Sequence, residues 1–249
     1  MTIRKKLDEI LKASKQPIAI FDLDGTVFDV VYRTMEIMRR FLALPEIRTR
    51  FPEQVASAAK LRHQDYHYGL ETTLNAIGID RYSEHSAHFI HAAETFWYKH
   101  FFIDELLAFD VPYAGALACV KQLKHAGVQI VYLSGRDIPN MSQGTLCALD
   151  RHGFPHTGHG ISICLKPAYG LDDLLFKKQS IESISTLGEV ILTLDNEPAN
   201  VQLFADRFPK ALHIHFNTHY AKPLELKGHH IHVIKSFGEL GYADESIDH

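Results

Sequence analysis

Six short apolar runs constrain the fold of this chain more than any other feature. They are apolar almost throughout and lack the alternation of a strand with one solvent face, so they are typical of central parallel strands covered on both faces. Helical patterns, such as "GALACVKQLKHAG", separate them. The alternation predicts an α/β fold, a doubly wound Rossmann-like parallel sheet with right-handed crossovers. The runs lie at residues 17–24, 127–135, 160–167, 189–198, 211–217 and 229–236.

Residues 30–111 interrupt this alternation, because they contain no convincing strand. They show helical patterns over 30–44, 52–78 and 83–109. A structureless segment of that length is implausible inside a compact domain, so an inserted helical subdomain is the better interpretation. We therefore expect an α/β core from residues 1–29 and 112–249, and a helical subdomain from residues 30–111.

Composition narrows the class of partner. Lys and Arg number 26 against 30 Asp and Glu, so a formal charge of −4 favours neither long nucleic acid nor an anionic membrane. The cysteines Cys119, Cys147 and Cys164 are odd in number and widely spaced, which argues against a disulfide framework and predicts buried thiols in a reducing compartment. With no signal-peptide pattern and no run of membrane-spanning length, we expect a cytoplasmic protein.

Polar residues stand where three of the apolar runs end: Asp22, Ser134 and Asp195. Ligands of doubly wound sheets bind outside the carboxyl ends of the strands, so these side chains are expected to converge. Asp22 and Asp195 suit Mg²⁺, which prefers oxygen ligands and offsets the repulsion between carboxylates. Asp22 can also attack phosphorus and form an aspartyl-phosphate, while Asp24 protonates the leaving oxygen and later activates water.

Three of these segments resemble motifs of the haloacid dehalogenase superfamily. "IFDLDGTVFD" (20–29) resembles the first motif, "VYLSGR" (131–136) the second and "ILTLDNEPAN" (191–200) the fourth, in the family's order. The resemblance implies a phosphatase branch, because dehalogenase members lack the second aspartate of the first motif. It also implies that the helical insertion is a cap, which excludes water from the active site and recognises the substrate.

The resemblance implies a role for each matching residue. Asp22 is the nucleophile and a metal ligand, and Asp24 is the general acid and base, with its backbone carbonyl on the metal. Ser134 and the amide of Gly135 bind the phosphoryl group. Asp195 is the second carboxylate on the Mg²⁺ ion.

Two assignments stay open at this stage. The third motif is a lysine that balances the phosphate charge. Lys177 is preferred, followed by Lys178 and then Lys166, and at least two of these three lysines are expected at the surface. In the fourth motif, the family's second acid is replaced here. Asn196 or Asn200 is expected to offer an amide oxygen to the metal or its waters, and Asn196 is the choice.

Other residues have competing interpretations. Arg33 either faces the site or is a solvated helix residue, and Arg136 either contacts phosphate or, as we prefer, braces its loop. The aromatic stretch "FWYKHFF" (96–102) is expected to be core of the insertion rather than a substrate pocket. The sequence argues against a zinc site at His213 and His215, because no acidic or cysteine partner lies nearby.

The leading hypothesis is a Mg²⁺-dependent phosphatase that hydrolyses a small phosphorylated metabolite through an aspartyl-phosphate. The alternatives are a phosphatase of nucleotides or nucleic-acid ends, a phosphomutase, and a catalytically idle binding or regulatory protein on the same fold. An acid/base at position 24 argues against the last. The sequence does not indicate the oligomeric state.

Overall fold

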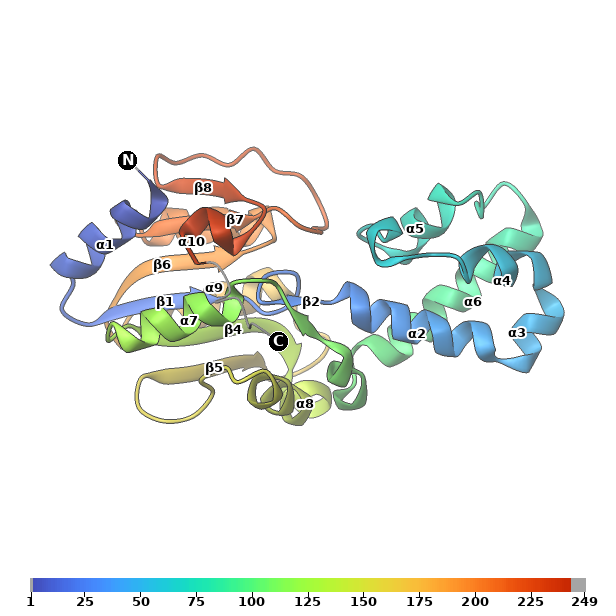
Figure 1. The fold of residues 1–249 in the computed structure, drawn as a ribbon, viewed down its shortest axis with the longest axis horizontal. Coiled ribbons are helices and arrows are strands. Elements are labelled where there is room, and N and C mark those ends of the chain that lie inside the picture. Colours follow the sequence, from blue (N-terminus) through green and yellow to red (C-terminus); the bar gives the residue numbers. More distant parts are fainter. Residues whose placement is uncertain (1, 243–249) are drawn as a thin grey trace, which may run out of the picture. The chain divides into compact units, whose positions relative to one another are not determined.

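The structure is a computed structural model and describes residues 2–242. The chain forms two compact units (Figure 1). One comprises residues 1–29 and 112–249, which we call the α/β unit, and the other comprises residues 30–111, which we call the helical unit.

The α/β unit is built on a six-stranded sheet in the order β5-β4-β1-β6-β7-β8, with every pairing parallel. This confirms the predicted doubly wound α/β fold. A separate pair, β2 and β3, lies where the chain passes between the units. The strands are β1 (Pro17–Phe21), β2 (Phe28–Asp29), β3 (Val111–Pro112), β4 (Gln129–Asp137), β5 (Ile161–Lys166), β6 (Glu189–Asp195), β7 (Leu212–Phe216) and β8 (Ile231–Ile234).

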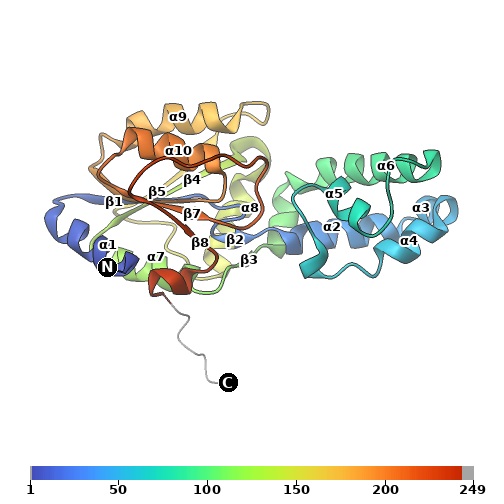
Figure 2. The same ribbon diagram turned by 90° about the horizontal axis from the view of Figure 1, so that it is seen from above.

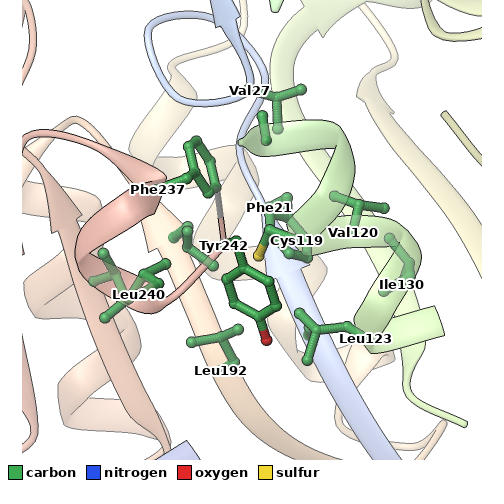
Figure 3. Packing of buried hydrophobic residues seen from close by; sticks show 14 of the residues in the cluster. Phe21, Val27, Cys119, Val120, Leu123, Ile130, Leu192, Phe237, Leu240 and Tyr242 are labelled. Atoms are coloured by element: carbon green, nitrogen blue, oxygen red, sulfur yellow. The ribbon is translucent and has the colours of Figure 1, made fainter. Parts of the chain in front are cut away.

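Helices cover both faces of this sheet, which is why its central strands are buried throughout. Figure 2 shows α9 (Asp173–Ile184) and α10 (Pro198–Arg207) on one face, and α1 (Ile3–Ala13) and α7 (Ala116–His125) on the other. Apolar side chains fill each interface, for example Phe176 and Phe204 on the first face and Leu7 on the second. Figure 3 shows the second core around Cys119 and Tyr242.

The region after β4 differs from the sequence prediction. The stretch "SQGTLCALDRHG" has a helical pattern that predicts a helix over residues 142–153, whereas α8 runs from Ile138 to Arg151. It starts early because the Asp137 carboxylate caps it, accepting a hydrogen bond from the Asn140 amide at 3.0 Å, and because a proline stands in the first turn. Strand β4 also continues past Ser134 to Asp137 with a register irregularity.

The regular elements of the helical unit are helices, except at Val111, where β3 begins. The pattern over residues 52–78 breaks into three short elements, with Gly69 in a left-handed conformation (φ 83°) at the start of the last. The stretch 83–109 likewise ends as a helix at Phe101. The elements are α2 (Val31–Ala43), α3 (Pro45–Arg50), α4 (Pro52–Ala58), η1 (His63–Asp65), α5 (Leu70–Ala76), α6 (Glu84–Phe101) and η2 (Asp104–Phe109).

Arg33 is wholly buried inside the helical unit, so its interpretation as a solvated helix residue is wrong. Its guanidinium donates to both oxygens of Asp110, at 2.7 and 2.9 Å, and lies 4.3 Å from the centre of the Phe101 ring. Trp97 stacks on the same ring. The aromatic stretch therefore contributes to the interior of this unit, although Tyr98 is exposed.

The cysteines are all free, but they are not all buried. Cys119 lies in the core and Cys164 is half-buried, whereas Cys147 on α8 is exposed, contrary to expectation. Among the described helices, none combines the length and apolar character needed to cross a membrane.

Candidate active site

Two aspartates and a lysine meet at the carboxyl edge of the sheet. Asp22 follows β1 and Asp195 ends β6, and the pairing of Phe21 with Leu194 places them on neighbouring strands. Lys177 on α9 reaches both, with Nζ 2.7 Å from Asp22 Oδ1 and 2.6 Å from Asp195 Oδ2. All three side chains are buried, so these are desolvated ion pairs.

The structure distinguishes the three candidate lysines. Lys177 lies between the two aspartates, whereas Lys178 points to solvent from the same helix. Lys166 is buried and paired with Asp173 at 2.6 Å, so the expectation that it is a surface lysine is wrong. Burial accounts for the difference between Lys177 and Lys178: consecutive helical residues point about 100° apart, and only the first faces the sheet.

The charges of this cluster perturb one another. Burial raises the pKa of Asp22 to about 7; Asp195 and Asp24 add to that rise, and Lys177 opposes it. Burial by itself lowers the pKa of Lys177, but the two carboxylates outweigh it and the net shift is upward. Lys177 therefore stays protonated, whereas Asp22 is incompletely ionised at neutral pH.

The turn after Asp22 depends on a glycine. Gly25 has φ 78°, a conformation that side-chain-bearing residues rarely adopt. A Cβ there would also collide with the side-chain amide of Asn196, so this loop and the one after β6 are in close contact. The turn directs the Asp24 side chain to Arg136, whose Nε donates to Asp24 Oδ1 at 2.9 Å.

The second motif lies on the neighbouring strand. Ser134 is buried in β4, which pairs with β1, and its Oγ accepts a hydrogen bond from the Arg136 amide at 3.3 Å. Gly135 is approached closely by the Asp173 carboxylate, so any larger residue would collide there. Lys177 thus connects Asp22 with Asp195, and Arg136 connects Asp24 with Ser134.

The residues after β6 hold Asp195 in place. Asp195 Oδ1 accepts hydrogen bonds from the Glu197 amide at 2.9 Å and from Asn200 Nδ2 at 3.1 Å. Asn200 thus presents its nitrogen to the carboxylate. Asn196 directs its Nδ2 to the carbonyl of His219, and its Oδ1 accepts a 3.4 Å bond from Thr26. Since a carbonyl oxygen has two lone pairs, that oxygen can still receive a cation or a water.

One segment was missed by sequence reasoning, namely residues 217–221 after β7, which we call the β7 loop. Thr218 donates to the carbonyl of Gly25 at 2.6 Å, and the Ala221 amide donates to the Glu197 carboxylate at 3.0 Å. Together with the bond between His219 and Asn196, these contacts tie the loop to both aspartate-bearing turns. Its place after a central parallel strand was the available signal, because such loops border the ligand site.

The two buried histidines are held by hydrogen bonds to protein. His213 contacts the Thr193 hydroxyl at 2.8 Å and the carbonyl of Phe208 at 3.0 Å, while His215 contacts the carbonyl of Asn196 at 3.0 Å. Burial lowers the pKa of both, to about 4 for His213. These contacts give both rings a structural role in fixing β7 against its neighbours.

The donor set at the sheet edge fits a hard divalent cation. Asp22 Oδ2 has no hydrogen-bond partner within the part of the chain that the structure describes, and the carboxylates of Asp22, Asp24 and Asp195 exceed the cations Lys177 and Arg136 by one charge. In the described residues, no group of three His, Cys, Asp or Glu side chains could hold a metal. Mg²⁺ suits such a site, since it takes one or two carboxylates and completes its shell with water and substrate phosphate.

The comparisons with known proteins agree with this fold. The family model for haloacid dehalogenase-like hydrolases matches residues 17–160. Among curated proteins, none matches the chain.

Solved structures resemble the chain at low identity. Protein Tyrosine Kinase A (PtkA) of Mycobacterium tuberculosis is 18% identical, with 91% of this chain and 96% of that chain covered and a TM-score of 0.52. A haloacid dehalogenase-like hydrolase structure from Burkholderia xenovorans LB400 is 12% identical, with coverage of 90% and 94% and a TM-score of 0.51. A dehalogenase with an intermediate complex is 14% identical, with coverage of 90% and 95% and the same score. At these identities the likeness concerns the fold alone.

Proposed function

Because this chain belongs to the haloacid dehalogenase-like hydrolases, we propose that it is a Mg²⁺-dependent phosphatase of small phosphate monoesters that works through an aspartyl-phosphate. The observation that carries the proposal is the buried Asp22, Lys177 and Asp195 cluster, with a second carboxylate, Asp24, two residues beyond the nucleophile. Hydrolases of this family that cleave carbon–halogen bonds lack that second carboxylate, so its presence favours phosphoryl transfer.

The proposed reaction has two displacements. In the first, a carboxylate oxygen of Asp22 attacks phosphorus, the bond from phosphorus to the ester oxygen breaks, and Asp24 gives its proton to that oxygen. In the second, Asp24 takes a proton from water, the water oxygen attacks phosphorus, and the bond to Asp22 breaks. Inorganic phosphate leaves and Asp24 is again protonated.

The remaining residues prepare these steps. Lys177 lies against the proposed nucleophile and opposes the rise in its pKa that burial causes, which favours the attacking carboxylate. Ser134 and the amide of Gly135 are proposed to bind phosphoryl oxygens. Asp22, Asp195, the backbone carbonyl of Asp24 and the side-chain oxygen of Asn196 would hold Mg²⁺, which supplies positive charge to the phosphoryl oxygens when bound.

The helical unit, residues 30–111, is proposed to act as the cap of this site. Its support is its position in the sequence, between the first and second motifs, and its own apolar core, which makes it a separate compact body. Caps of this kind exclude water and select the substrate away from the phosphate.

The proposal is tested by p-nitrophenyl phosphate hydrolysis, with Mg²⁺ and then with EDTA, for the wild type, Asp22→Asn and the matched surface variant Lys178→Met. We expect activity that requires Mg²⁺, is lost in Asp22→Asn and is retained in Lys178→Met. If the wild type is inactive, binding of the phosphoryl mimic BeF₃⁻ to Asp22 is measured with Mg²⁺ present. Absence of both hydrolysis and binding would contradict the proposed function.

A further inference from the structure

We propose that Arg136 is a positioning residue, which fixes the carboxyl group of Asp24 for proton transfer and the hydroxyl of Ser134 for phosphate binding; this inference rests on the proposed phosphatase function. The first observation is that Arg136 donates two hydrogen bonds to Asp24. Both Nε and Nη2 of Arg136 donate to the same oxygen, Asp24 Oδ1, the former at 2.9 Å. Two donors on one oxygen restrict rotation of the carboxyl group about its Cβ–Cγ bond.

Arg136 is itself immobilised by other contacts. Its side chain has no exposed surface, whereas the Asp24 side chain is 28% exposed. Its remaining terminal nitrogen, Nη1, donates to Thr145 Oγ1 at 3.3 Å, and that hydroxyl in turn donates to the carbonyl of Met141 at 2.6 Å. The guanidinium also lies 5.4 Å from the centre of the Phe28 ring. The buried arginine is therefore well placed to fix the orientation of the more accessible Asp24 carboxyl group.

The backbone of Arg136 acts on the other half of the site. Its amide donates to Ser134 Oγ at 3.3 Å. Because a serine hydroxyl has a single proton, an oxygen that accepts from Arg136 leaves that proton for an acceptor such as a phosphoryl oxygen. One residue thus sets both the phosphate-binding hydroxyl and the acid that serves the leaving group.

The topology explains why this residue can reach both partners. Strands β1 and β4 are parallel neighbours, so Asp24, two residues beyond Asp22, and Arg136, two residues beyond Ser134, leave the same edge of the sheet side by side. The irregularity in β4 between Ser134 and Asp137 falls at this point. Arg136 thus belongs to the proton-transfer geometry rather than contacting phosphate or simply bracing its own loop.

The test uses the leaving group, because only proton donation depends on it. We would measure kcat/KM of the wild type, Arg136→Lys and Asp24→Asn for dinitrophenyl, p-nitrophenyl and phenyl phosphate. Arg136→Lys retains the charge but cannot place two donors on one oxygen. A good leaving group departs without a proton, whereas a poor one requires the acid, whose contribution is about 10²-fold or more.

The expected result for Arg136→Lys is a loss of about 10²-fold with phenyl phosphate and only a few-fold with dinitrophenyl phosphate. Asp24→Asn should show the same trend more strongly, and the double variant should lose little beyond Asp24→Asn because the two residues act as one unit. Arg151→Lys, at the exposed end of α8, is the control and should match the wild type throughout.

Each other outcome is decisive. An equal loss across the three substrates would overturn the inference, since a general structural defect does not distinguish leaving groups. A wild type that shows neither Mg²⁺-dependent hydrolysis nor binding of BeF₃⁻ would instead refute the proposed function. If Arg136→Lys does not fold, Thr145→Val leaves Arg136 in place and removes the hydroxyl that supports Nη1, and it should show a weaker form of the same trend. A flat response of that variant would overturn the inference.

Discussion

Replacing Lys177 by methionine should destabilise the α/β unit strongly in the absence of metal. The ammonium group contacts two buried carboxylates at 2.7 and 2.6 Å, and the variant leaves both of them desolvated and close together. Removing one partner of a buried ion pair costs about 3 to 5 kcal/mol of the free energy of unfolding. Lys178→Met, which changes the adjacent exposed lysine, should stay within about 0.5 kcal/mol of the wild type.

The cost should also depend on pH in a defined direction. The pKa of Asp22 is about 7 in the folded protein, above its ordinary value of 3.8. The folded state therefore binds the extra proton, and the contribution of Asp22 to stability falls as pH rises from about 4 to 7 and then levels off. Without Lys177 the pKa rises further, so the variant continues to lose stability above pH 7, by up to about 1.4 kcal/mol per pH unit.

The assay is urea denaturation in EDTA at several pH values, followed by far-UV circular dichroism and by fluorescence. The single tryptophan, Trp97, lies in the helical unit, so fluorescence reports that unit and dichroism reports both. Added Mg²⁺ should restore part of the stability lost in Lys177→Met, because a cation that binds only the folded state stabilises it. The reasoning fails if Lys177→Met is no more destabilising than Lys178→Met, or if their difference does not widen above pH 7.

The remaining predictions concern the support of the site. The pKa of His213 is lowered to about 4 from an ordinary 6.5, so its neutral ring should account for about 3 kcal/mol of stability lost between pH 6.5 and 4. In urea unfolding, the stability of the wild type and of His125→Gln relative to that of His213→Gln should therefore fall by this amount over that range. Gly25→Ala should lower the free energy of unfolding by more than about 2 kcal/mol, since backbone strain and a collision with Asn196 coincide there. Gly127→Ala, with φ 86° and open space around it, should lose only the roughly 1 kcal/mol of backbone strain. Equal losses of the two variants in thermal unfolding would contradict the collision. Thr218→Val should be less stable than Thr218→Ser by about 1 kcal/mol in the free energy of unfolding, because serine retains the hydrogen bond to the carbonyl of Gly25. A smaller difference would show that other contacts hold the β7 loop.

The strands and the aspartates of this site were predictable because their signals are local. An apolar run without alternation marks a buried parallel strand, and a polar residue at its end marks the ligand edge, so Asp22 and Asp195 follow from short windows of sequence. Lys177 was preferred on a local likeness as well. Its burial between two carboxylates, by contrast, depends on how α9 packs on the sheet.

The rest could not be predicted, because it depends on contacts between distant residues. Arg136 meets Asp24 from 112 residues away, and Thr218 meets Gly25 across 193 residues. Lys166 is buried where the loop after β5 and the start of α9 fold over it, and there it pairs with Asp173 and donates to the carbonyl of Leu171. Cys147 is exposed because that position of α8 faces away from the sheet, which an apolar neighbourhood in sequence does not reveal.

The balance of charge links the stability of this site to its proposed chemistry. Lys177 is shared between Asp22 and Asp195, and Arg136 is paired with Asp24, so the cluster has one negative charge in excess when all three carboxylates are ionised. A phosphate dianion is repelled by such a cluster, whereas a divalent cation is attracted. The two ligands must therefore favour each other, because each cancels the charge that opposes the other, and this coupling is reciprocal by thermodynamic necessity. The raised pKa of Asp22, whose largest cause is burial, is increased further by the negative charges of Asp195 and Asp24, so a bound cation should lower it.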